Sequence, residues 1–158
     1  MTLPAITPAY RLLFALVLTV VVVASGQDVD LDVKPGLKDD PAAKAIRKVV
    51  DDNCLASRNE DLPAALRTIH PKSPGYAYTE QTSRALFDKY DLDYKVIRFT
   101  FIGRDDPYAV ARVILRTANR GTTSKFSNNT TDSMMTFRLD GPAWKLWTQS
   151  TLEVDEAP

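Results

Sequence analysis

The sequence contains one cysteine and one histidine among its 158 residues. A single cysteine excludes an internal disulfide framework and any metal site built from several thiolates. A single histidine, His70, excludes sites that need two imidazole side chains. We therefore expect neither a bound metal ion nor a cofactor.

An excess of charge of one sign is also missing. The chain has 20 Lys plus Arg and 20 Asp plus Glu, and its isoelectric point is about 6.6. Domains that bind nucleic acid carry a basic excess, so the composition argues against nucleic acid as a partner. The length and the 44% hydrophobic content are typical of one globular domain with its own core.

Long hydrophobic runs are absent, but a shorter one lies near the N-terminus. Arg11 precedes it, residues 12–23 carry no charge, and small residues follow at 24–26. This order is typical of a secretory signal peptide, and the run is shorter than the roughly 20 residues that a spanning helix needs. We therefore expect residues 1–26 to be a signal peptide and the protein to be secreted or periplasmic. The alternative is an uncleaved segment that anchors the chain in a membrane.

The helices are predicted in the first half of the remaining chain. Residues 27–40 mix charges with a Pro-Gly pair and indicate a flexible linker. Asp40 can cap a helix over residues 41–58 whose apolar stripe includes Cys54, which we expect to be a small buried side chain. Two shorter helices are predicted, over residues 62–69 and from a Thr79 cap to residue 90.

The strands are predicted after residue 93, where the hydrophobic period changes from helical to two. The predicted strands cover residues 94–102, 108–118, a part of 122–139, and 143–154. Asp140-Gly141 is a strong hairpin signal between the last two. The domain is thus expected to cover residues 41–154, with 155–158 as a tail.

Alternation along these strands predicts two different sheet faces. The apolar face should pack on the helices, and it contains Ile97, Phe99, Phe101, Ala111, Val113, Leu115, Met135, Phe137 and Leu139. The opposite face mixes aromatic and Arg side chains, which are enriched in protein interfaces. We expect a homodimer through this face, made by Tyr108, Arg112, Arg116 and Arg138. The alternative is a solvated face. In either case we expect the arginines to pair with Asp132 and Tyr108, within one chain or across a dimer.

The order of three helices and four antiparallel strands resembles the nuclear transport factor 2-like superfamily. Trp144-Lys145-Leu146 after the hairpin is similar to the closing pattern of many secreted SnoaL-like bacterial proteins. The resemblance covers about residues 41–154. It implies an α+β, cystatin-like fold, in which three N-terminal helices pack in a curved four-stranded antiparallel sheet and leave a conical pocket. Family members include ketosteroid isomerases, cyclases and dehydratases, and also proteins that only bind or assemble; many dimerise through the sheet.

A catalytic member of this superfamily needs a carboxylate base in an apolar pocket and a donor for a developing oxyanion. The candidate acids are Asp93 and Asp132, and the candidate donors are Tyr94, Tyr108, Asn128 and Asn129. Alternation places Asp132 on the outer face, and only a bulge within residues 122–133 would reverse this. The sequence therefore gives little support to an enzyme.

A small hydrophobic ligand is the other use of such a pocket. The candidate binding residues are Phe99, Phe101, Met135, Trp144 and Trp147, with Asn129 and Gln149 as polar contacts. Most of these aromatic side chains can instead fill the core. We expect a non-catalytic small-molecule-binding or accessory module; the alternative is a small SnoaL-like or ketosteroid-isomerase-like lyase or isomerase. A secreted inhibitor with an exposed apolar patch is a third hypothesis.

Overall fold

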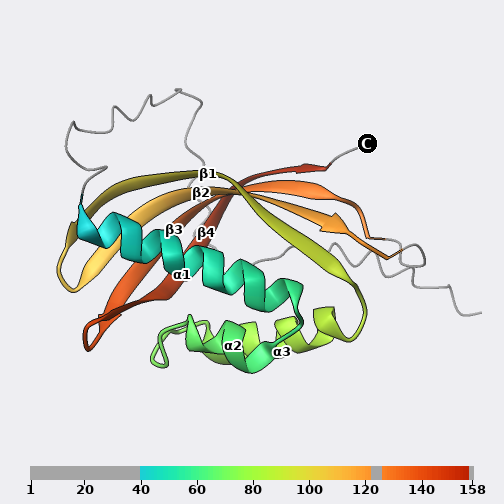
Figure 1. Cartoon of the computed structure of the whole chain (residues 1–158), viewed down its shortest axis with the longest axis horizontal. Helices are drawn as coiled ribbons and strands as arrows, with labels where there is room; N and C mark the ends of the chain where they lie inside the picture. The colour runs from blue at the N-terminus through green and yellow to red at the C-terminus, as the bar shows by residue number, and fades with distance from the viewer. Residues whose placement is uncertain (1–39, 122–125, 157–158) are drawn as a thin grey trace, which may run out of the picture.

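The computed structural model describes residues 40–121 and 126–156, so the predicted signal peptide and nearly all of the predicted linker lie outside the described residues. Three helices lie on one side of a four-stranded antiparallel sheet in the order β1-β2-β3-β4 (Figure 1). The elements are α1 (Pro41–Arg58), α2 (Leu62–Arg67), α3 (Tyr76–Phe87), β1 (Leu92–Asp105), β2 (Tyr108–Asn119), β3 (Asn129–Asp140) and β4 (Ala143–Glu156). The sheet curves over α1, and α2 and α3 lie beyond it. The predicted fold class is confirmed.

Two of the three helices begin where the sequence predicts. The Asp40 carboxylate accepts a hydrogen bond from the Ala42 N–H at 2.8 Å, and Asp61 accepts one from Ala64 at 2.9 Å. These side chains satisfy backbone donors that a helix start leaves free. The third helix begins three residues before the predicted Thr79 cap, because Gly75 takes the cap position. The Thr79 hydroxyl instead donates to the Gly75 carbonyl at 2.8 Å.

The strands are longer than predicted, and β1 contains two bulges, of which the first changes which side chains face the helices. The pairing with β2 shifts between Val96 and Arg98 and between Phe101 and Gly103, so that Ile97 and Ile102 are extra residues. Ile97 is 53% exposed, and its predicted place on the apolar face is wrong. Tyr94, before the first bulge, is buried on the concave side instead. A bulge also bends a strand, and it therefore helps the sheet to curve.

Two further bulges occur where β4 pairs with β3. Trp147 and Leu152 are the extra residues there. The pairing of β2 with β3 is regular, so Asp132 stays on the same face as Arg112, as alternation predicts. The faces predicted for the side chains of β2 and β3 are correct, because the pairing of these two strands contains no bulge.

The core lies between α1 and the half of the concave face nearest the β1–β2 and β3–β4 hairpins. Ile46, Ala111, Val113 and Phe137 are completely buried there. Phe101, Met135 and Trp144 belong to the same cluster, and Phe99 and Cys54 are half-buried against it. Core filling therefore accounts for most of the aromatic side chains that the sequence also offers as a pocket lining.

The segment after α2 holds the helical layer to the edge of the sheet. Ile69 forms a parallel bridge with Leu146 of β4, and the His70 N–H donates to the Leu146 carbonyl at 2.8 Å. The buried His70 ring accepts a hydrogen bond from the Lys72 N–H at Nδ1, 3.0 Å away, and meets the edge of Trp147 at 5.0 Å. The single histidine therefore has a structural role. Among the described residues, no helix is long and apolar enough to span a membrane.

Candidate functional site

Toward the β2–β3 connection, the concave face changes from apolar to polar. The strand pairing places six hydroxyl and amide side chains on this half: Thr117, Asn129, Thr131, Ser133, Gln149 and Thr151. We call these six residues the polar half of the concave face. Thr117, Thr131 and Ser133 are buried. None of the six carries a charge, so this surface suits a neutral hydrogen-bonding group.

The polar half retains unused hydrogen-bonding capacity. The Gln149 amide donates to the Ser133 hydroxyl at 3.0 Å, and the Thr131 hydroxyl lies 3.4 Å from Asn129 Oδ1. The Thr151 hydroxyl is buried and has no hydrogen-bond partner in the described part of the chain. Buried polar groups are nearly always paired with protein or water. A water molecule or a bound molecule could satisfy this hydroxyl.

Cys54 of α1 and Tyr94 of β1 provide the nearby titratable groups. Burial raises the pKa of the Cys54 thiol to about 12; the Asp51 carboxylate adds to this and the Arg47 guanidinium opposes it. Burial also raises the pKa of Tyr94, with smaller contributions from Cys54 and Glu60. Both side chains are therefore protonated and neutral near pH 7. A protonated thiol is a poor nucleophile.

Asp132, one of the two candidate bases, lies on the outer face and is bound to Arg112. Its carboxylate receives two hydrogen bonds from the Arg112 Nε at 3.0 Å and one from the Nη2 at 2.6 Å. This hydrogen bonding raises the pKa of Arg112. A bidentate pair of this kind fixes both side chains. The predicted pairing of Arg112 with Asp132 is confirmed, and it forms within one chain.

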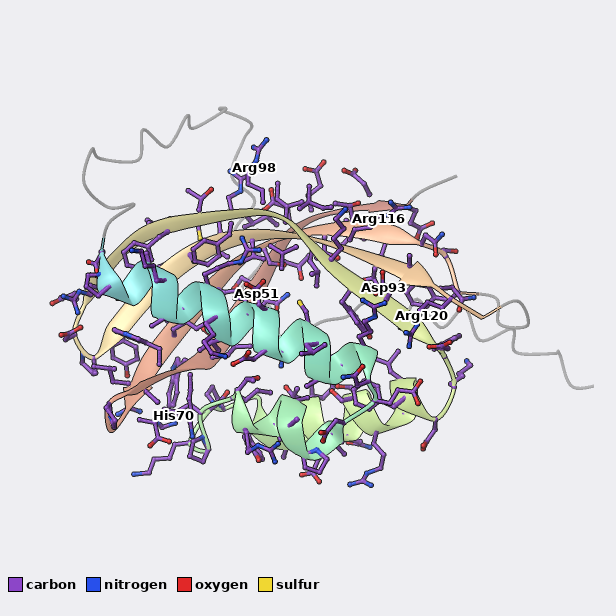
Figure 2. All side chains as sticks on the ribbon, viewed as in Figure 1. Asp51, His70, Asp93, Arg98, Arg116 and Arg120 are labelled. Carbon is purple, nitrogen blue, oxygen red and sulfur yellow. The ribbon has the colours of Figure 1, made fainter. Side chains whose placement is uncertain are left out.

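Asp93, the other candidate base, lies at the corner where β1 meets the end of α1 (Figure 2). Its Oδ1 is 3.2 Å from the Arg58 Nε. Arg120 lies at the same corner, where it donates to Asp91 at 2.8 Å and to the Arg58 carbonyl at 2.8 Å. This network joins α1 to β1 and β2. The structure therefore does not bring Asp93 and Asp132 together, and neither lies on the polar half of the concave face.

Trp147 lies apart from the other candidate binding residues because it is an extra residue of β4. Its ring lies 6.3 Å from Tyr108, and the Arg138 guanidinium lies 4.7 Å from the Trp147 ring and 5.5 Å from Tyr108. These are outer-face residues, so Trp147 does not line the concave face with Gln149 and Asn129. Arg98 and Arg116 extend away from the same convex side of the sheet (Figure 2).

Sequence reasoning found only two members of the polar half, Asn129 and Gln149. Thr131 and Ser133 were missed although they share the parity of Met135, which the sequence places on the helix side. Extending the alternation backward from Met135 would have found them. Alternation could not have predicted the position of Thr151, because the bulge at Trp147 shifts the alternation of β4.

Comparison with known proteins identifies the family of the chain. Residues 48–156 match the family model described as the C-terminal domain of the anti-sigma-I factor RsgI9. The chain belongs to this family. A comparison with curated protein sequences gives no match.

Solved structures share the fold of this RsgI9 C-terminal-domain family member. A protein from Novosphingobium aromaticivorans assigned as an aromatic ring hydroxylase has a TM-score of 0.63 and 14% identity, over 73% of this chain and 92% of that one. A nuclear transport factor 2-like protein with a cystatin-like fold from the same organism has a TM-score of 0.54 and 14% identity, over 68% and 79% of the two chains. A ketosteroid isomerase-like protein from Erwinia carotovora atroseptica has a TM-score of 0.53 and 14% identity, over 72% and 98%. These structures confirm the expected nuclear transport factor 2-like, cystatin-like fold.

Proposed function

We propose that this domain is a secreted or periplasmic, non-catalytic binding module whose ligand contacts the polar half of the concave face. The observation that carries this proposal is that Asp132 is hydrogen-bonded to an arginine side chain on the outer face, and that Asp93 lies in an ion pair with another arginine. Asp93 Oδ1 itself has no hydrogen bond among the described residues. Asp132 is paired with Arg112 and Asp93 with Arg58. A general base must be within hydrogen-bond reach of the proton that it removes, and these pairs hold both carboxylates elsewhere.

The buried polar side chains support binding of a small ligand that is neutral at its polar end. Ser133, Gln149 and Thr151 can donate or accept hydrogen bonds without adding charge. The neighbouring aromatic and aliphatic core would contact the apolar part of the ligand. The matched family is named for a domain of an anti-sigma factor, and a ligand-responsive accessory domain is a suitable role in such a regulator.

The alternative is a small SnoaL-like or ketosteroid-isomerase-like lyase or isomerase, and one structural neighbour is named a ketosteroid isomerase-like protein. This mechanism requires a carboxylate within about 3 Å of a substrate proton. Asp132 would have to leave Arg112 and cross to the other face of β3. The binding proposal needs no such rearrangement.

Native mass spectrometry of the full chain, expressed with its N-terminal segment in a secreting bacterial host, tests location and binding together. We expect the secreted protein to lack residues 1–26 and to retain a small-molecule adduct. Retention of the N-terminal segment would contradict the signal-peptide proposal. A protein that carries no adduct and gains none from the extract of the host would contradict the binding proposal.

A threonine-to-valine pair tests whether the Thr151 hydroxyl is an unpaired group in the ligand-free protein. Thr151→Val should raise the free energy of unfolding by about 1 kcal/mol, because it removes a buried hydroxyl that has no partner and keeps the shape of the side chain. Thr148→Val on the outer face is the matched control and should have little effect. Urea denaturation of both variants gives the comparison. A loss of stability in Thr151→Val would show that this hydroxyl is already paired.

We also propose a homodimer through the convex face of the sheet. Of the four predicted contact residues, Arg112 and Arg138 are used within the chain, by Asp132 and by the Tyr108 and Trp147 rings. The Arg116 side chain is exposed, and so is the apolar Ile97. A second copy would cover this mixed apolar and basic surface.

Light scattering after size exclusion tests the dimer. The wild-type chain should have the mass of a dimer. Ile114 is paired with Asp132 on the convex face, and Ile114→Glu should have the mass of a monomer, because it buries an unpaired charge in the interface. Leu55→Glu on α1 is the control, since Leu55 is 57% exposed and lies on the helical side. A wild-type monomer, or a dimer that survives Ile114→Glu, would contradict this arrangement.

A further inference from the structure

A second candidate binding site lies on the helical layer, away from the sheet's concave face. A groove of about 480 Å³ runs between α2, α3 and the start of β4. Leu62, Leu66, Ile69 and Tyr76 provide its apolar lining. Its volume falls in the range of about 300–1,000 Å³ that is usual for small-molecule sites.

The charged side chains of this groove are mainly cationic. Arg67, Arg84 and Lys145 line it, and Glu80 is the one acidic residue of the lining. Glu80 lies 3.3 Å from Arg84, and Lys145 lies 2.6 Å from Asp140, so these charges already have partners. Arg67 is exposed and has no ion pair within the described residues. The groove therefore combines an apolar floor with one uncompensated guanidinium.

The groove is built on a backbone that is fixed from two sides. Arg67 is the last residue of α2, and the next residue, Thr68, accepts a hydrogen bond from the Leu146 N–H at 2.9 Å. The Ser73 hydroxyl donates to the Trp147 carbonyl at 2.6 Å. A second groove between α1 and α2 shares Arg67 and Lys145 with the first. Arg67 and Lys145 therefore lie between the two grooves.

We propose that the α2–α3 groove binds a small amphipathic carboxylate. Its apolar body would lie on Leu66 and Tyr76, and its carboxylate would pair with Arg67. A guanidinium suits this role because its planar set of N–H donors matches the two oxygens of a carboxylate. The site is separate from the polar half of the concave face, so it does not depend on the function proposed above.

Two acids and their neutral counterpart test this site on the full chain. The probes are 4-phenylbutyrate, octanoate and 4-phenyl-1-butanol, titrated by NMR. We expect at least one acid to bind at millimolar Kd or better, about tenfold more tightly than the alcohol, because a charge-assisted pair adds about one factor of ten or more. Arg67→Gln should remove this difference. Lys44→Gln removes the same charge from an exposed position on α1, and it should leave the difference in affinity between acid and alcohol unchanged.

The shifted resonances distinguish this site from the one under the sheet. Binding in the groove should shift signals of α2, α3 and Lys145, whereas binding at the polar half should shift signals of Ser133, Gln149 and Thr151. The proposal is overturned if neither acid binds at up to about 10 mM, if Arg67→Gln and Lys44→Gln weaken binding equally, or if the shifts lie at the polar half and not on α2 and α3.

Discussion

Ile46→Ala should lower the free energy of unfolding by about 2–5 kcal/mol, whereas Ile97→Ala should change it by less than about 0.5 kcal/mol. Ile46 of α1 is completely buried, and Ile97 of β1 is 53% exposed. Removing buried methyl and methylene groups costs their transfer free energy and leaves a cavity. The same atoms removed from an exposed side chain leave no cavity.

This pair of identical substitutions tests the bulge at Ile97 as well as the core. Strict alternation along β1 would place Ile97 beside Phe99 and Phe101, against the helices. Ile97→Ala would then cost nearly as much as Ile46→Ala. Urea denaturation followed by tryptophan fluorescence, at the lowest readable protein concentration, separates core packing from any contribution of the dimer. Equal losses in the two variants would contradict the bulge.

The Cys54 thiol should react with Ellman's reagent at pH 8 at least about 30-fold more slowly in the folded than in the unfolded protein, because the lower thiolate fraction outweighs the higher nucleophilicity of the thiolate. Burial raises its pKa from an ordinary 9.0 to about 12, and only the thiolate attacks the reagent. Each unit lowers the thiolate fraction about tenfold well below the pKa. The matched control is Leu55→Cys in a Cys54→Ala background, since Leu55 is the next residue and 57% exposed. A Cys54 rate within about tenfold of this control would contradict the assignment.

The same shift predicts how stability changes at alkaline pH. The folded state keeps the Cys54 proton up to about pH 12, whereas the unfolded chain loses it near its ordinary value of 9.0. The contribution of this thiol to stability is therefore complete below pH 9 and is lost as the pH rises toward 12. Tyr94 acts in the same direction, because its pKa is also raised. Cys54→Ala should weaken the alkaline loss of stability without abolishing it.

The ion pairs of Asp93 and Asp132 bear on the function of the protein more directly than its fold does. In the sequence, the two acids lie near the start of β1 and within β3, and no neighbouring residue identifies a partner for either of them. Nothing local indicates that Arg58, at the far end of α1, reaches Asp93. Arg112 and Asp132 come from different strands, and their pairing depends on the register of β2 with β3. Only the assembled sheet decides whether an acid is available as a base.

Features that depend on neighbouring residues follow from the sequence alone. The bounds of α1, the caps at Asp40 and Asp61, the turn at Asp140-Gly141 and the order of helices and strands all follow from local chemistry. A capping side chain lies two or three residues from the N–H that it satisfies, so such signals are complete within a short window. The alternation of β2 and β3 is local in the same sense.

The tertiary structure decided which side chains share a surface. Curving the sheet over α1 is accompanied by bulges at Ile97, Ile102, Trp147 and Leu152, and each bulge breaks the alternation between the residues before it and those after it. Tyr94, before a bulge, and Thr151, after one, are on the concave side for this reason. The bulge positions depend on how helices and strands pack together, and this packing has no signature in any single strand.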